Sequence, residues 1–239
     1  MNGGNSAVLP HSETHGNGLA ARLNWLRAGV LGSNDGIVSV AGIVIGVAAA
    51  TADRGTIMTA GIAGLAAGAV SMALGEYVSV STQRDSERAI LEVERRELAE
   101  QPEAELAELA AIYEHKGLSP VTARRVAEEL TAQDAFLAHA EAELGIDPNE
   151  LTNPVHAAVS SAISFTLGAL LPLLAILVPT AIRVPFTAGA VLVALASTGA
   201  AGAWLGQAPV RPATIRVLIG GAVAMLVTYT VGHLVGVAL

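Results

Sequence analysis

The chain has 239 residues, of which 52% are hydrophobic and only 14% are charged, and its mean hydropathy is +0.55. Soluble globular proteins carry roughly 25% charged residues, so this composition excludes an ordinary soluble domain and indicates a membrane protein. The absence of cysteine excludes disulfides, thiolate metal sites and cysteine nucleophiles, and the net charge of −8 disfavours nucleic acid as a partner.

Five apolar windows follow a polar N-terminal stretch. The first 20 residues lack a positively charged region followed by an apolar core, as a signal peptide would have, and we expect a mobile tail over residues 1–24. A spanning helix needs about 20 mostly apolar residues. The windows that meet this length are Ala28–Ala52, Thr56–Val80, Pro154–Val178, Val184–Gly206 and Pro212–Val237.

A polar insert separates the second window from the third. Residues 84–150 contain 17 acidic and 7 basic residues, whereas only four acids lie elsewhere. The sequence therefore predicts an all-α membrane protein with transmembrane helices one and two in 25–83, a three-helix acidic domain in 84–150, and transmembrane helices three to five in 151–239. If the N-terminus is cytoplasmic, eleven of the thirteen Lys and Arg residues lie inside, so the positive-inside rule predicts a cytoplasmic insert and an outer C-terminus.

The insert is expected to form three helices. Residues 83–100 continue the second span without a breaker, and Pro102 ends that helix or opens the next. The second helix stops at Gly117, a residue type suited to a C-cap. The third runs from Ser119 to Gly145.

Glutamates at helical spacing predict a metal site in this insert. Glu94 and Glu97 share one helix face, as do Glu105 and Glu108. Because Pro102 lies between the two pairs, they belong to different helices that can face each other. Facing carboxylates make a hard, oxygen-rich site for divalent cations.

The third helix of the insert adds a different donor. His139 and Glu143 are four residues apart and share a face, and an imidazole shifts the preference towards Fe(II), Mn(II) or Zn(II). A solvated helix surface is the alternative, and its usual mark is pairing of Glu with Lys or Arg at i,i+4. From Glu97 to Glu114 no such base is available, so both interpretations stay open.

Three residues in the first two spans are candidates for a transport pathway. Asp35 falls in the first turns of span one, where an ionisable group is by default a functional hypothesis, although the preceding Ser and Asn also suit a helix cap. Met72 offers a soft thioether, or it serves packing alone. Glu76 lies near the inner end of span two, from which it could also reach the interface.

Taken together, these segments resemble the vacuolar iron transporter (VIT) family, in a bacterial-type form. The motifs that carry the resemblance extend from about Trp25 to the end of the chain and are GVLGSNDGIVSVAGIVIGVA, TAGIAGLAAGAVSMALGEYVSVSTQRD, ELAAIYEHKGLSPVTARRVAEEL, NPVHAAVSSAISFTLGALLPLL and GQAPVRPATIRVLIGGAVAMLVTY. The resemblance implies a homodimer in the lipid bilayer that moves Fe(II), often with Mn(II), out of the cytoplasm in exchange for protons.

The resemblance also implies roles for individual residues. The aspartate and the methionine that line the family's pathway match Asp35 and Met72. The metal ligands of the family's cytoplasmic domain match Glu94, Glu97, Glu105, Glu108, His139 and Glu143. Some members carry a glutamate where this chain has Gly64, which puts the proton coupling in doubt, and Glu76 could take over part of that role.

The sequence therefore predicts a proton-coupled exporter of divalent iron, with manganese or zinc as further cargo, and not an enzyme. No permanently bound cofactor is expected, and the predicted location is the bacterial cell membrane. A non-transporting metal sensor is the alternative, and Asp35 discriminates because a sensor needs no charge within a span. A membrane hydrolase is disfavoured because no nucleophile is suggested.

Overall fold

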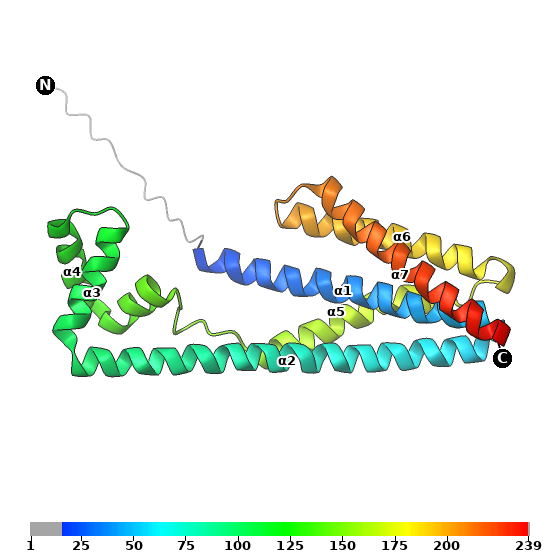
Figure 1. Cartoon of the computed structure of the whole chain (residues 1–239), viewed down its shortest axis with the longest axis horizontal. Coiled ribbons are helices and arrows are strands. Elements are labelled where there is room, and N and C mark those ends of the chain that lie inside the picture. Colours follow the sequence, from blue (N-terminus) through cyan, green and yellow to red (C-terminus); the bar gives the residue numbers. More distant parts are fainter. Residues whose placement is uncertain (1–15, 239) are drawn as a thin grey trace, which may run out of the picture. The chain divides into compact units, whose positions relative to one another are not determined.

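The computed structural model describes residues 16–238, and every regular element within them is a helix, which confirms the all-α prediction (Figure 1). The predicted tail, residues 1–24, lies mostly outside this range. The elements in chain order are α1 (Gly16–Ala50), α2 (Arg54–Glu100), α3 (Pro102–His115), α4 (Pro120–His139), a π-helical turn η1 (Ala140–Leu144), α5 (Pro154–Ala175), α6 (Thr180–Leu205) and α7 (Val210–Ala238).

Five of these helices are long and apolar enough to cross a membrane, as predicted: α1 from Gly32, α2, α5, α6 and α7. At 47 residues, α2 is more than twice as long as a span requires. No breaker interrupts its backbone after the apolar part, so the helix continues into the charged sequence.

The chain divides into two compact units. Gly75–His156 form one unit, and the remaining described residues form the other. The second half of α2, α3, α4 and η1 thus belong to the unit that holds the acidic insert, whereas α1, α6, α7 and most of α5 belong to the apolar one.

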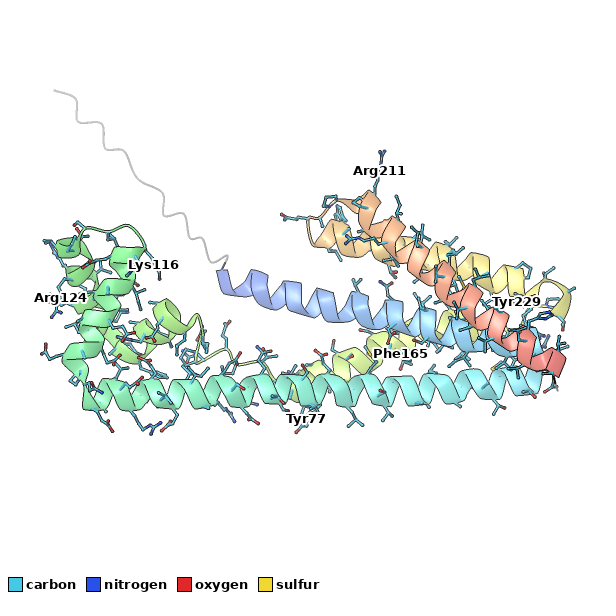
Figure 2. The ribbon with its side chains drawn as sticks, viewed as in Figure 1. Tyr77, Lys116, Arg124, Phe165, Arg211 and Tyr229 are labelled. Atoms are coloured by element: carbon cyan, nitrogen blue, oxygen red, sulfur yellow. The ribbon has the colours of Figure 1, made fainter. Side chains whose placement is uncertain are left out.

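Small residues allow the apolar helices to approach closely. A Cβ atom at Gly36 would lie 2.1 Å from the backbone oxygen of Phe165 on α5, and one at Gly232 of α7 would lie 1.9 Å from the oxygen of Gly46. Only glycine fits such backbone contacts. Phe165 is itself buried in a cluster with Val40 and other residues of α1, α2 and α5 (Figure 2).

In the insert unit, the helix boundaries follow the predicted signals. Pro102 opens α3, Gly117 adopts a positive φ of 101°, and the Ser119 side chain accepts a hydrogen bond from the Thr122 backbone at the start of α4. The third predicted helix differs from its expectation, because its backbone leaves the helical region at Asp134 (φ −159°, ψ 97°). It then resumes and ends in η1.

Candidate metal centre

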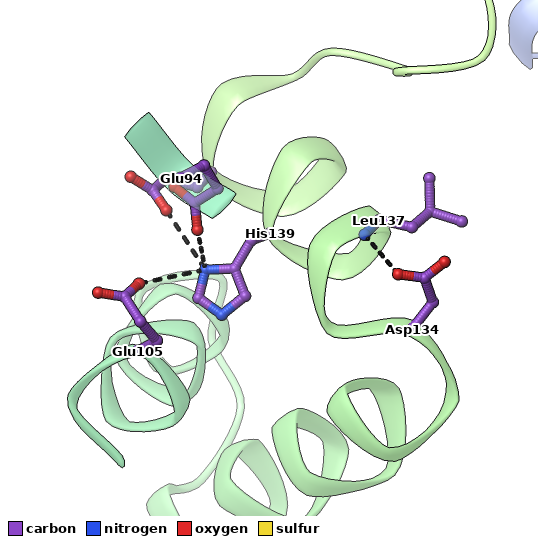
Figure 3. A network of polar contacts seen from close by, with 6 residues as sticks. Glu94, Glu105, Asp134, Leu137 and His139 are labelled. Atoms are coloured by element: carbon purple, nitrogen blue, oxygen red, sulfur yellow. Dashed lines mark hydrogen bonds and ion pairs between the residues drawn. The ribbon is translucent and has the colours of Figure 1, made fainter. Parts of the chain in front are cut away.

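The imidazole of His139 is the centre of a group of carboxylates (Figure 3). Its Nδ1 atom lies 3.0 Å from Glu94 Oε1, 3.7 Å from Glu105 Oε2 and 3.5 Å from Glu143 Oε2. His139 is fully buried, Glu94 is 3% exposed and Glu105 is 7% exposed. Three separate helical elements and one turn thus bring four ionisable side chains to one point.

Two interruptions in the helices bring these residues together. Gln101 and Pro102 separate α2, which carries Glu94, from α3, which carries Glu105 in its first turn. On α4 the break at Asp134 restarts the helix, and the Asp134 carboxylate accepts a hydrogen bond of 3.0 Å from the Leu137 backbone. This contact is an N-cap bond. It fixes the start of the short segment that carries His139.

The π-helical turn η1 adds the fourth side chain. It begins directly after His139 and includes Glu143, whose side chain is 30% exposed. Single π-helical turns are uncommon and frequently lie at functional sites. Here the turn keeps Glu143 within 3.5 Å of the imidazole and opens one side of the cluster towards solvent.

Several donor atoms of this group lie close together but form no hydrogen bonds with one another. Glu94 Oε1 and both ring nitrogens of His139 are buried and have no hydrogen-bond partner, so the 3.0 Å contact lacks hydrogen-bond alignment. Buried polar atoms of this kind require an explanation. Neighbouring ligands on one first-row cation, with bonds of about 2.1 Å, lie roughly 3.0–3.4 Å apart. The 3.0 Å contact of Glu94 falls in this range, and the contacts of Glu143 and Glu105 with the same nitrogen are 0.1–0.3 Å longer than its upper limit, so small side-chain movements would bring the donors around a shared cation.

Electrostatics in the cluster favours a positive guest. Burial raises the pKa of Glu94, and the negative charge of Glu143 raises it further, against the opposing effect of His139. Burial also raises the pKa of Glu105, with repulsion from Glu108 as the next cause. Both shifts mean that the ionised carboxylates lack enough compensating charge within the folded chain.

The predicted ligands therefore separate into two groups. Glu94, Glu105 and His139 offer donor atoms that all lie within 4.8 Å of one another, and Glu143 contacts the same imidazole. Glu97 and Glu108 are exposed. They act on the cluster through their charge, since Glu97 contributes to the raised pKa of both buried glutamates.

The three pathway candidates occupy different environments. Asp35 lies in the first turn of the apolar part of α1 and is exposed; its Oδ1 accepts a hydrogen bond of 3.1 Å from Ser39. Met72 is half-buried and packs against the cluster around Phe165. Glu76 is half-buried and belongs to the insert unit.

Polar neighbours of Asp35 fix the start of this span. Ser33 donates a hydrogen bond of 3.3 Å to the Ser164 carbonyl of α5, and Thr198 of α6 donates one to the side chain of Asn34. The two residues before Asp35 therefore attach α1 to its neighbours, while Asp35 itself is exposed.

Comparison with known proteins accounts for this combination of apolar helices and acidic insert. Residues 26–233 match the VIT family. The chain belongs to the VIT family. It is 46% identical over 212 residues to "Vacuolar iron transporter" of Acanthamoeba castellanii, which covers 88% of this chain and 78% of that protein. It is 39% identical over 218 residues to "Vacuolar iron transporter homolog 1" of Oryza sativa subsp. japonica, covering 90% and 76%.

A third VIT-family relative extends the match over nearly the whole chain. "Vacuolar iron transporter homolog 2.1" of Arabidopsis thaliana is 35% identical over 236 residues, covering 98% of this chain and 92% of that protein. These names describe transporters, which confirms the prediction of a membrane transporter rather than an enzyme. They also confirm the resemblance inferred from the sequence motifs.

Sequence reasoning did not identify Asp134. An acidic residue within a strongly helical stretch of alternating polar and apolar residues gives no clear break signal, although aspartate is a favoured N-cap. Lys116 was also missed: its ammonium donates a 3.4 Å hydrogen bond to the Ala142 carbonyl, which ties the end of α3 to η1.

Proposed function

We propose that this VIT-family protein exports divalent iron from the cytoplasm in exchange for protons, with Mn(II) or Zn(II) as further cargo. The observation that carries the proposal is the buried group of Glu94, Glu105 and His139. A donor set of carboxylate oxygens and one imidazole suits Fe(II), Mn(II) and Zn(II). The relatives named as iron transporters support iron as the physiological member of that set.

In this proposal the acidic insert collects metal. Residues 84–150 carry an excess of ten negative charges, which raises the local concentration of cations. Glu97 and Glu108 contribute to this field from the exposed faces of α2 and α3. Glu94, Glu105, His139 and Glu143 provide the ligands.

Asp35, Met72 and Glu76 form the proposed membrane pathway. An exposed carboxylate on an apolar helix is costly against lipid. The cost falls if a second copy of the chain covers Asp35 and encloses a polar path between the two. This argument supports a homodimer in which the first spans of the two protomers meet.

Proton exchange follows from competition for the same oxygens. Carboxylates bind metal only when deprotonated, so metal binding releases protons and protonation releases metal. The two effects are reciprocal by linkage. The raised pKa values of Glu94 and Glu105 bring their protonation closer to physiological pH.

The distribution of basic residues supports a cytoplasmic insert, with eleven of thirteen bases on that side. The relatives carry the word vacuolar in their names. Export from the cytoplasm is compatible with a vacuolar membrane or a cell membrane, and the bacterial cell membrane stays a prediction.

The proposal is tested in proteoliposomes that contain a pH-sensitive dye. Added Fe(II) or Mn(II) should drive metal uptake with opposite proton movement, and Asp35→Asn should abolish both. Asp53→Asn is the matched control: Asp53 caps α2 by accepting bonds from Thr56, and asparagine caps equally well. Metal binding without any flux in the unmodified protein would instead favour the sensor, and full flux in Asp35→Asn would refute the pathway.

A further inference from the structure

A pocket of about 310 Å³ lies in the insert unit, and its lining includes none of the four residues of the metal centre. Arg88, Leu91, Glu92 and Arg95 line it from α2, and Phe136 lines it from α4. The spacing of 88, 91, 92 and 95 corresponds to one stripe of a helix. The pocket is therefore built by a continuous helix face and a facing aromatic ring.

The pocket is amphipathic. Besides Leu91 and Phe136, its apolar lining includes Pro148 and Leu151 from the segment that leads to α5. The Arg95 side chain in its lining is held in place, because its guanidinium stacks on the Phe136 ring. The Arg95 Cζ atom lies 4.2 Å from the ring centroid. Stacking leaves the edge of the guanidinium available for hydrogen bonds.

The arginines of this stripe lack acidic partners among the described residues. Arg124 and Arg125 on α4 form ion pairs with Glu128 and Glu129 at 2.8 and 2.9 Å. Within residues 16–238, no ion pair involves Arg88, Arg95 or Arg84 one turn earlier on α2.

The lack of partners is unexpected in a segment with 17 acids and 7 bases. The Nε atom of Arg84 is buried and has no hydrogen-bond partner. Glu92 is the one acid in the pocket lining, against two arginines. The pocket therefore keeps positive charge available for an external anion.

Its position along the chain places the pocket beside the membrane. On α2, Arg88 follows the end of the apolar window at Val80 by eight residues, which is about 12 Å of helix. Leu151 precedes Pro154, the first residue of α5, by three positions. The headgroup layer of a bilayer is roughly 5–8 Å thick on each side, so a lipid phosphate lies within reach of the extended side chains of Arg84 and Arg88. Arg95 follows Val80 by 15 residues, about 22 Å of helix, and lies beyond the phosphate on the aqueous side.

We propose that this pocket binds a phosphate-bearing anion, specifically the headgroup of an anionic phospholipid. Arg88 binds the phosphate, with Arg84 on the membrane side. Arg95, Leu91 and Phe136 contact the headgroup glycerol, which extends from the phosphate away from the bilayer. Basic pockets beside transmembrane helices have this recognition chemistry. The bound lipid joins α2 to the segment that leads into α5.

Purified protein in neutral detergent tests the proposal. Dioctanoyl phosphatidylglycerol should raise the melting temperature in a saturable way, and dioctanoyl phosphatidylcholine should not. Arg88→Gln combined with Arg95→Gln should weaken the anionic lipid about 30-fold, since each arginine near the surface contributes on the order of a tenfold factor or less. Arg124→Gln with Arg125→Gln removes the same charge elsewhere on the insert (Arg124 is labelled in Figure 2) and should leave lipid affinity unchanged.

The other possible results also decide whether the pocket binds an anionic lipid. Equal binding of the neutral lipid, or unchanged affinity in the Arg88 and Arg95 double variant, overturns the proposal. Inorganic phosphate that binds as tightly as the anionic lipid, with the same dependence on both arginines, supports the phosphate site but overturns lipid as its source. Mn(II) binding reports whether the insert is folded; if the double variant does not bind Mn(II), Arg88→Lys alone should still weaken the lipid. None of these readouts requires transport, so a failure of export leaves this test intact.

Discussion

Glu94→Gln separates a metal site from a structural ion pair. The substitution keeps the shape of the side chain and removes its charge, and Glu94 Oε1 contacts His139 Nδ1 at 3.0 Å in a buried setting. If the contact were chiefly a stabilising ion pair, glutamine would destabilise the metal-free protein. If the cluster serves a cation, glutamine should stabilise the metal-free protein and weaken metal binding.

The expected size of each effect follows from the geometry. The donor oxygens of Glu94 and Glu105 lie within 4.8 Å, and two unit charges at that distance repel by about 3 kcal/mol at an effective dielectric constant of 20. Attraction to His139 offsets part of this repulsion, so we expect a net gain of about 1–2 kcal/mol in the unfolding free energy of the metal-free insert. Substitution of residues that only hold metal ligands in place lowers metal affinity about 10–100-fold. Loss of a ligand itself should therefore lower the Mn(II) affinity about 100-fold.

Two measurements on the same protein check this pair of effects. Thermal unfolding after chelator treatment gives the stability, and competition with a fluorescent chelator under anaerobic conditions gives the Mn(II) and Fe(II) affinities. Glu97→Gln is the control, because Glu97 is exposed on the same helix, and it should change affinity severalfold at most. A lower melting temperature of metal-free Glu94→Gln together with unchanged Mn(II) affinity would refute the reasoning.

Three further predictions concern the same fold. Because the pKa values of Glu94 and Glu105 are raised in the fold, their stabilising contribution is complete below the ordinary glutamate pKa and is lost as the pH rises through the raised values. Melting curves of the chelator-treated protein should therefore show stability that declines as the pH rises above the ordinary glutamate pKa, and Mn(II) affinity should rise over the same range. A Cβ at Gly232 would lie 1.9 Å from a backbone oxygen of α1, whereas one at Gly220 meets no atom within 4 Å. Gly232→Ala should therefore lower the unfolding free energy of the protein in detergent by about 1–3 kcal/mol. The control Gly220→Ala should leave it unchanged. Asp134→Ala should remove an N-cap worth about 0.5–2 kcal/mol and weaken Mn(II) binding, while Asp134→Asn should retain both, as measured by the same melting and competition assays.

Much of the fold is predictable because its signals are local. The apolar windows, the proline that opens α3 and the glycines that follow α3 and η1 each act through the residues next to them. Glu94 and His139 were also predictable as ligand types, since their chemistry depends on side-chain identity. Local signals therefore predict the helices and the residue types that can act as metal ligands.

The selection among those donors was not predictable in the same way. Helical spacing treats Glu94 and Glu97 alike, and likewise Glu105 and Glu108. Only packing against α4 decides that the first of each pair is buried and the second is exposed. That packing depends in turn on the break at Asp134, which redirects the chain before η1.

The length of α2 constrains how collection and transport can be connected. Glu76 and Glu94 lie in the same compact unit and on one uninterrupted helix, 18 residues apart, which corresponds to about 27 Å. A cation held by Glu94 therefore cannot contact Glu76 at the same time. The cation must dissociate from Glu94 before Glu76 can bind it. In the proposed transporter the insert then acts by supplying ions near the pathway. Glu94→Gln should raise the KM for Mn(II) flux and leave the maximal rate nearly unchanged, whereas loss of the carboxylate at Glu76 should lower the maximal rate. An equal fall in maximal rate for Glu94→Gln would show instead that the buried cluster lies on the obligatory path.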